Sequence, residues 1–166
     1  MKADKIYVVG FMAAGKTTLA RALAKRLGWL AVDIDELIER RERMSVADIF
    51  ARHGEPYFRV IERTVLFEQL SPRHLVVATG GGTFVDATNR AAIKGDGLSV
   101  WLDAPLDCVI ARLPSDGRRP LAADRSTFER LYHQRRAAYQ FADMRLDAGR
   151  ASVEALAEQV LDWLES

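Results

Sequence analysis

The sequence predicts a single α/β domain in three layers, with a five-stranded parallel sheet flanked by helices. Short apolar runs of strand length alternate with helical patterns from one end of the chain to the other, which is typical of a parallel sheet. The 166 residues suffice for one compact core but not for a second full domain, so residues 1–166 are expected to form one unit. A glycine-rich stretch separates the first apolar run from the first helical pattern, as in the first turn of a βαβ unit.

The expected strands are the apolar runs at 6–9, 30–32, 75–78, 98–102 and 144–146. The expected helices span 16–27, 35–43, 46–53, 56–70, 106–113, 126–139 and 152–164. Two or three of these helices follow the second strand, which is more than a single crossover needs. The segment from about 35 to 62 is therefore expected to project beyond the sheet edge as a helical substrate-binding insert.

Composition restricts the class of partner. The formal net charge is only +1 and the charged residues of both signs are interspersed, which argues against a nucleic-acid partner and against a membrane surface. Cys108 is the single cysteine, so no internal disulfide is possible. No apolar stretch approaches the roughly 20 residues that span a bilayer. We expect a cytoplasmic protein that acts on small molecules, with a monomer as the default state.

Residues 10–17, the phosphate loop, read Gly-Phe-Met-Ala-Ala-Gly-Lys-Thr and fill the pattern G-x-x-x-x-G-K-[ST]. Gly10 and Gly15 permit a backbone that turns consecutive amides toward phosphate oxygens at a helix N-terminus. Lys16 is expected to reach the β- and γ-phosphates, and Thr17 to offer a ligand to Mg²⁺. A chance match is the alternative, but the flanking strand and helix favour nucleotide binding. The nucleotide contacts are expected from Gly10, Ala13, Ala14, Gly15, Lys16, Thr17 and Thr18.

Two carboxylates, Asp33 and Asp35, stand two residues apart at the end of the second strand. In extended geometry they would share a face, at the sheet edge where ligands of parallel sheets bind. One could hold Mg²⁺ through water, while the other accepts or orients a substrate hydroxyl. The alternative is that Asp35 caps the following helix and Asp33 is merely solvated.

Three further features are candidates for substrate binding. Arg59 and Glu62 are three apart on one helix face, although a plain surface ion pair would look the same. Three consecutive glycines, residues 80–82, indicate close backbone approach to a ligand opposite the phosphate loop. Residues 113–124 combine proline, glycine and adjacent arginines, which predicts either a mobile lid or an ordinary surface connection. Arg59, Arg119 and Arg135 would together suit a small carboxylate.

The order of these motifs resembles the shikimate kinase family over nearly the whole chain. The resemblance is carried by the phosphate loop, Asp33-x-Asp35, Phe58-Arg59-x-x-Glu62, Gly80-Gly81-Gly82, Arg119-Pro120 and Arg135-x-x-x-Tyr139. It implies a P-loop kinase fold and transfer of the ATP γ-phosphoryl group to the 3-hydroxyl of shikimate. Mg²⁺ is then the implied cofactor, with ATP and shikimate as the small-molecule partners.

The resemblance also implies roles for individual residues. Lys16 steadies the β- and γ-phosphates, Thr17 binds Mg²⁺, and Asp33 holds the water shell of the metal. Asp35 meets the shikimate hydroxyls, with Lys16, Asp35 and Arg119 as the catalytic group. The remaining substrate contacts are implied for Arg59, Glu62, Gly80, Gly81, Gly82 and Arg135, and the adenine contact for Arg112. Ala137-Ala138 depart from the Pro-Leu usual in the family, which affects the expected pitch of Arg135, and Arg118 is an extra lid arginine.

Two other activities are compatible with the residues alone. Another small-molecule kinase, for gluconate or a nucleoside monophosphate, would use the same core with a different acceptor pocket. A nucleotide-dependent switch or ATPase would instead place Asp103 on Mg²⁺ at the end of the fourth strand. The chain lacks the Asn-Lys-x-Asp guanine signature, and Asp103 before Ala104-Pro105 more simply predicts a helix cap.

Overall fold

The computed structural model describes residues 1–113 and 124–166. Within them, one sheet is formed by β1 (Lys5–Val9), β2 (Leu30–Asp33), β3 (Leu75–Ala78), β4 (Leu98–Asp103) and β5 (Met144–Asp147). The strand order is β2-β3-β1-β4-β5 and every pairing is parallel. The five predicted strands are confirmed, each to within two residues.

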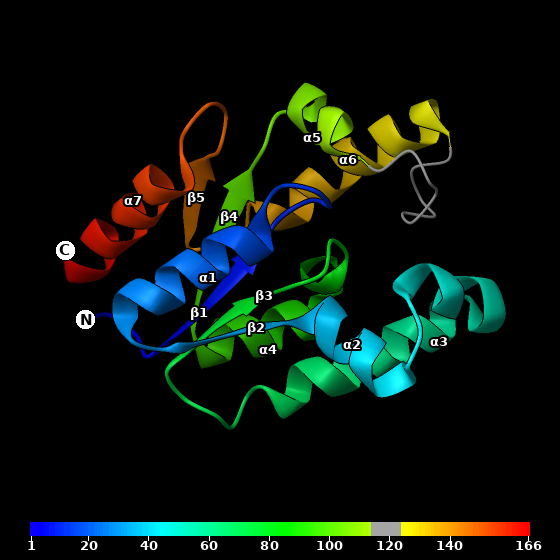
Figure 1. Cartoon of the computed structure of the whole chain (residues 1–166), viewed down its shortest axis with the longest axis horizontal. Coiled ribbons are helices and arrows are strands. Elements are labelled where there is room, and N and C mark those ends of the chain that lie inside the picture. Colours follow the sequence, from blue (N-terminus) through cyan, green and yellow to red (C-terminus); the bar gives the residue numbers. More distant parts are fainter. Residues whose placement is uncertain (114–123) are drawn as a thin grey trace.

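The described helices are α1 (Lys16–Leu27), α2 (Ile34–Glu42), α3 (Val46–Glu68), α4 (Ala87–Asp96), α5 (Leu106–Arg112), α6 (Arg125–Tyr139), α7 (Val153–Glu165) and the short 3₁₀ helix η1 (Thr83–Val85). Helix α1 packs on α7 and on β1, β2 and β3, whereas α4 packs on β4, α3 and η1. Figure 1 shows α1 in front of the sheet and α4 behind it, so the predicted three layers are confirmed.

The strand order places the phosphate loop at the centre of the fold. Strand β1 lies between β3 and β4, and the chain leaves it to form α1 over one side of the sheet. At such a reversal of strand order, the loops beyond the strand ends diverge and leave a crevice for a ligand. The core supports this position, because Ile6, Tyr7, Val8 and Val9 are completely buried.

Helices α2 and α3 form the segment expected to project from the sheet. In Figure 1 they extend beyond the strand ends, on the side of the loop that follows β1. Helix α3 contains Gly54 with φ 82° and ψ 168°, so two helical stretches meet at a kink. Glycine adopts this backbone without the steric cost that a Cβ would bring. The expected break between residues 53 and 56 is therefore confirmed.

Helix α4 is the element that the sequence analysis missed. Its sequence Ala-Thr-Asn-Arg-Ala-Ala-Ile-Lys-Gly-Asp buries only Asn89 and Ile93, so it has no continuous apolar stripe. Asp86 starts it by accepting a hydrogen bond from the amide of Asn89 at 2.9 Å. The capping interaction and contacts with the sheet thus define a helix that periodicity does not reveal.

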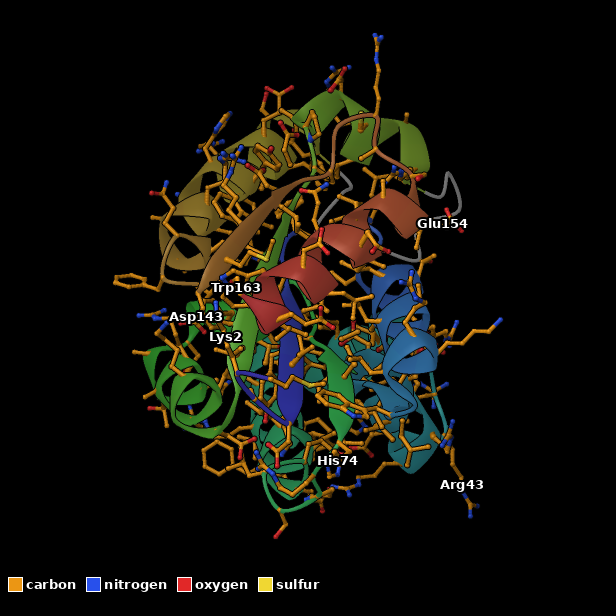
Figure 2. All side chains as sticks on the ribbon, turned by 90° about the vertical axis from the view of Figure 1, so that its left-hand side faces the viewer. Lys2, Arg43, His74, Asp143, Glu154 and Trp163 are labelled. Atoms are coloured by element: carbon orange, nitrogen blue, oxygen red, sulfur yellow. The ribbon has the colours of Figure 1, made fainter. Side chains whose placement is uncertain are left out.

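The two ends of the chain lie close together at α7 (Figures 1 and 2). The Lys2 ammonium lies 5.0 Å from the centre of the Trp163 ring, and the Lys2 amide donates to the Leu164 carbonyl at 3.3 Å. Among the described helices, none is both long and apolar enough to cross a lipid bilayer.

Candidate active site

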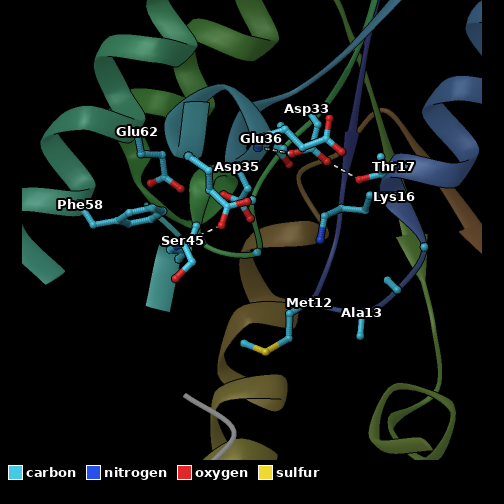
Figure 3. Close-up of a pocket in the computed structure, with 18 of the residues that line it drawn as sticks. Met12, Ala13, Lys16, Thr17, Asp33, Asp35, Glu36, Ser45, Phe58 and Glu62 are labelled. Atoms are coloured by element: carbon cyan, nitrogen blue, oxygen red, sulfur yellow. Dashed lines mark hydrogen bonds between the residues drawn. The ribbon is translucent and has the colours of Figure 1, made fainter. Parts of the chain in front are cut away.

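A cleft of about 610 Å³ opens at the carboxyl ends of the central strands. Figure 3 shows Thr17 and Asp33 close together in it, and Lys16, Asp35 and Glu62 also line this cleft. The predicted site residues that line it are Ala13, Ala14, Gly15, Lys16, Thr17, Thr18, Asp33, Asp35, Arg59, Glu62, Gly80, Gly81, Gly82, Arg112 and Arg135. Arg118, Arg119 and most of the predicted lid fall at 114–123, outside the described residues.

The phosphate loop presents backbone amides to the cleft. Gly15 precedes α1 with φ 99° and supplies no side-chain cap, which is typical of a helix N-terminus that binds an anion. The Lys16 ammonium donates to the carbonyls of Gly10 at 2.9 Å and Phe11 at 2.8 Å, which holds it inside the loop. Gly10 is needed for packing: a Cβ there would lie 2.7 Å from the Leu102 carbonyl oxygen, and Gly10 does not itself line the cleft.

Asp33 joins the phosphate loop to α2. Its Oδ1 accepts a hydrogen bond from the Glu36 amide at 3.0 Å, and its Oδ2 accepts one from the Thr17 hydroxyl. Asp33 is therefore the cap of α2, and the alternative that Asp35 is the cap was wrong. The expected extended geometry was also wrong, because β2 ends at Asp33 and Asp35 lies in the first turn of α2.

The donor set around Thr17 suits one kind of metal site. No cluster of three or more His, Cys, Asp or Glu side chains able to hold a metal occurs within residues 1–113 and 124–166. Thr17 and Asp33 instead supply a pair of hard oxygens beside the phosphate loop. Mg²⁺ characteristically takes one or two protein oxygens and completes its shell with water and phosphates. The residues present thus fit a phosphate-bound Mg²⁺.

The three consecutive glycines pass close to the functional side chains. A Cβ on Gly80 would lie 2.8 Å from Asp35 Oδ1, and one on Gly81 would lie 3.3 Å from the Met12 amide nitrogen. One on Gly82 would lie 2.5 Å from Arg59 Nη1. A methyl group at any of the three would therefore crowd the site. The prediction that this loop faces the phosphate loop is confirmed.

Arg59 and Glu62 form a partly enclosed ion pair on α3. Glu62 is 1% exposed and accepts from Arg59 Nη1 at 3.1 and 3.2 Å, while Glu55 accepts from Nη2 at 3.1 Å. Burial acts to lower the pKa of Arg59, but the two carboxylates outweigh it and the pKa is raised. The surface-pair alternative is wrong for Glu62, because this carboxylate is removed from solvent.

Arg135 is a charged side chain that lines the cleft and is nevertheless buried. It is 7% exposed, and its guanidinium lies 5.8 Å from the centre of the Phe11 ring. Within the part of the chain that the structure describes, no carboxylate forms an ion pair with it, and burial lowers its pKa. Tyr139, one turn along α6, donates its hydroxyl to the Gly81 carbonyl. Despite Ala137-Ala138, α6 therefore directs Arg135 into the cleft.

Arg112 lies beside the phosphate loop. It is the last residue of α5, one residue before the expected end of this helix, and its Nη1 donates to the Ala14 carbonyl at 3.1 Å. This contact ties the end of α5 to the phosphate loop and leaves the planar guanidinium along the cleft wall.

The cleft also contains residues to which the sequence analysis gave no role. Phe50 and Phe58 pack against each other with ring centres 4.8 Å apart and ring planes tilted by 40°, and they form an apolar wall. Their helical spacing was the available signal, but core packing produces the same spacing. The others are Met12, Glu36, Glu39, Ser45, Val46 and Thr79.

Asp103 has a different role from both alternatives considered for it. It is 6% exposed, does not line the cleft, and forms ion pairs with Arg136 and Arg145. Helix α5 is preceded by Pro105 at its cap position, so Asp103 is not a cap. The carboxylate therefore links α6 to β5 through these two ion pairs. Because Asp103 does not line the cleft, it cannot serve as the Mg²⁺ ligand that the ATPase alternative requires.

Asp103→Asn is accordingly expected to lower stability and leave catalysis nearly unchanged. Loss of the charge weakens two partly exposed ion pairs, which should cost about 1–3 kcal/mol of unfolding free energy. Thermal and urea unfolding would measure this cost, and ADP formation would measure turnover. A selective loss of Mg²⁺-dependent turnover in folded protein would contradict the structural role.

Comparisons with known proteins identify the family. The family model described as shikimate kinase matches residues 12–165. A shikimate kinase of Persephonella marina is 39% identical over 157 residues, covering 94% of this chain and 96% of the relative. A shikimate kinase from Acinetobacter baumannii, solved in complex with shikimate, has a TM-score of 0.94 and 35% identity, covering 98% of this chain and 93% of its own.

A more distant structure supports the fold alone. Deoxyadenosine kinase from M. mycoides, solved with dCMP and dCDP bound, has a TM-score of 0.68 at 17% identity, with coverage of 97% of this chain and 98% of its own. The predicted P-loop kinase fold is thereby confirmed. The matched motifs, the cleft that brings them together and the agreement along nearly the whole length lead to one conclusion: this chain belongs to the shikimate kinase family, whose members are ATP-dependent small-molecule kinases.

Proposed function

We propose that the protein transfers the γ-phosphoryl group of ATP to the 3-hydroxyl of shikimate, giving shikimate 3-phosphate and ADP on the route to chorismate and the aromatic amino acids. The observation that carries this proposal is the buried Arg135, which faces the cleft without a carboxylate partner among the described residues. A buried guanidinium is costly unless it is paired. A carboxylate on the acceptor would supply the missing partner.

Arg59 would provide the second contact to that carboxylate. Its guanidinium and that of Arg135 lie against neighbouring glycines, since a Cβ on Gly81 would be 3.0 Å from Arg135 Nη1 and one on Gly82 would be 2.5 Å from Arg59 Nη1. Two guanidiniums that flank one loop suit a small planar anion. Phe50 and Phe58 offer an apolar surface for the carbon ring of the acceptor.

Asp35 would bind the hydroxyl that reacts. Its carboxylate and that of Glu62 approach the same point, at 2.8 and 3.2 Å from a Cβ built on Gly80. An acceptor that places its carboxylate at Arg59 and Arg135 would extend its hydroxyls toward Asp35. Asp35 would accept the proton of this hydroxyl or orient its oxygen toward the transferred phosphoryl group.

The nucleotide half of the site would hold ATP and Mg²⁺. The amides at the start of α1 and Lys16 would bind the phosphates, and Arg112 would stack on the adenine. Thr17 would bind Mg²⁺ directly and Asp33 would do so through water. When bound, the metal neutralises charge on the phosphate oxygens. We propose Arg119 as the lid arginine that supplements this charge, in a cytoplasmic monomer.

Acceptor-dependent ADP formation tests the proposed function. Shikimate should stimulate ADP formation strongly, whereas gluconate and nucleoside monophosphates should not. Shikimate methyl ester should show a KM raised by about 10- to 100-fold, because a charged hydrogen-bonded contact is typically worth about 1.5–3 kcal/mol. Stimulation by another acceptor would overturn the pocket assignment. Acceptor-independent hydrolysis would instead favour an ATPase.

A further inference from the structure

Thr83 connects two parts of the acceptor pocket. It is the first residue of η1, directly after the three glycines, and it is completely buried. Its hydroxyl donates to Glu62 Oε2 at 2.9 Å and accepts from the Gly80 amide at 3.0 Å. One hydroxyl thereby fixes both the glycine loop and a carboxylate on α3.

Glu62 transmits this contact to Arg59. Both carboxylate oxygens of Glu62 accept from Arg59 Nη1, and Glu62 is 1% exposed, so no bulk water is available to replace a lost partner. The orientation of the carboxylate determines where the guanidinium is held. The Thr83 hydroxyl occupies one of its oxygens and thus restricts its rotation about the terminal bond.

The second hydrogen bond acts on the glycine loop. Gly80 donates its amide to Thr83 Oγ1 and lies against Asp35, with 2.8 Å between a Cβ built there and Asp35 Oδ1. A shift of this loop would change the space available to an acceptor hydroxyl beside Asp35. Thr83 therefore influences both ends of the acceptor pocket without lining the cleft itself.

We propose that Thr83 is a positioning residue for the acceptor, acting through Glu62 on Arg59 and through the Gly80 amide on the wall beside Asp35. The inference rests on the proposed function and goes beyond it by assigning a role to a residue that touches neither substrate. The hydrogen bonds of Thr17 and Asp33 in the nucleotide half involve neither Thr83 nor Glu62, so removing the Thr83 hydroxyl leaves them in place.

Thr83→Val removes the hydroxyl and keeps the shape of the side chain. The Gly80 amide and Glu62 Oε2 then each lose a partner in a buried setting. We expect KM for shikimate to rise about tenfold, because the glycine loop and Glu62 are no longer fixed by the hydroxyl. KM for ATP should stay within about twofold of wild type, because the phosphate loop is not connected to Thr83 by these bonds. Thr83→Ser keeps the hydroxyl, so its KM for shikimate should be close to that of wild type.

Ser99 offers a matched control within the same chain. This buried hydroxyl of β4 also donates to a carboxylate, Asp143 Oδ2 at 2.9 Å, and accepts from a backbone amide, that of Asp143 at 3.1 Å. The pair joins β4 to the segment before β5, outside the cleft; Asp143 is labelled in Figure 2. Ser99→Ala should lower the melting temperature and leave both KM values unchanged.

A double-mutant cycle that combines Thr83→Val with Glu62→Gln tests whether Thr83 acts through Glu62. If Thr83 acts through Glu62, the rise in shikimate KM in the double variant should be smaller than the product of the two single rises. Unchanged shikimate KM in folded Thr83→Val, equal rises for ATP and shikimate, or multiplicative effects would each overturn the inference. If Thr83→Val does not fold, Thr83→Ala gives the same readouts. Failure of the wild type to phosphorylate shikimate would instead refute the proposed function.

Discussion

Asp35→Asn is expected to lower the rate of shikimate phosphorylation by about 10²- to 10⁴-fold, the range for losing a positioned acid–base group. The amide keeps the size of the side chain and can still accept a hydrogen bond, but it has no negative charge and cannot take up the hydroxyl proton. ATP should still bind, because the phosphate loop and the Thr17–Asp33 pair remain intact. Single-turnover phosphorylation and ATP titration, performed on the same preparation, would separate the two effects.

Asp107→Asn provides the control for this experiment. Asp107 lies in the first turn of α5, as Asp35 lies in the first turn of α2, but it is exposed and does not line the cleft. Its replacement should leave turnover unchanged. If Asp35→Asn retained full activity, Asp35 would be only a wall residue, since the cap of α2 is Asp33.

Arg119→Ala should reduce kcat by about 10³- to 10⁵-fold, as expected for an arginine that stabilises charge on a transferred phosphoryl group. The expectation rests on the Arg119-Pro120 motif, which lies outside the described residues. KM for ATP should change much less, because the contact would form mainly in the transition state. Steady-state kinetics with ATP and shikimate varied separately would measure both constants.

Arg118→Ala is the matched control, because it removes the same charge one residue earlier in the chain. Its kcat should remain close to that of wild type. Near-normal turnover of Arg119→Ala would rule out the assignment, and a large loss in Arg118→Ala alone would move the catalytic role to that neighbour.

Local sequence was sufficient to predict those features that depend on the backbone conformation of a short segment. Loops with this glycine spacing characteristically bind phosphate through backbone amides and one lysine, so residues 10–17 were sufficient to predict a nucleotide site. The break expected between residues 53 and 56 coincides with Gly54 and Pro56, two residues that interrupt a helix through their own backbones. In contrast, α4 was missed, because only two of its residues are buried and local propensity did not distinguish it from a loop.

The roles of the acidic residues could not be read from their neighbours in the sequence. Asp33 and Asp35 were expected on one extended face, but the strand ends at Asp33, which bonds both Thr17 and the Glu36 amide. Asp103 was expected to cap a helix or bind a metal, whereas its partners Arg136 and Arg145 follow it by more than thirty residues. A carboxylate can be satisfied by any donor that folding brings near, and only the packed structure selects among them.

The sequence by itself determined the α/β class, the five strands, the phosphate loop and, through the order of its motifs, the resemblance to shikimate kinases. These features depend on periodicity and on short patterns that act locally. Only the tertiary structure decided which charged side chains are buried. Glu62 and Arg135 look like ordinary surface residues in the sequence, but they are 1% and 7% exposed. Burial depends on how distant helices pack against one another, and short sequence patterns do not reveal that packing.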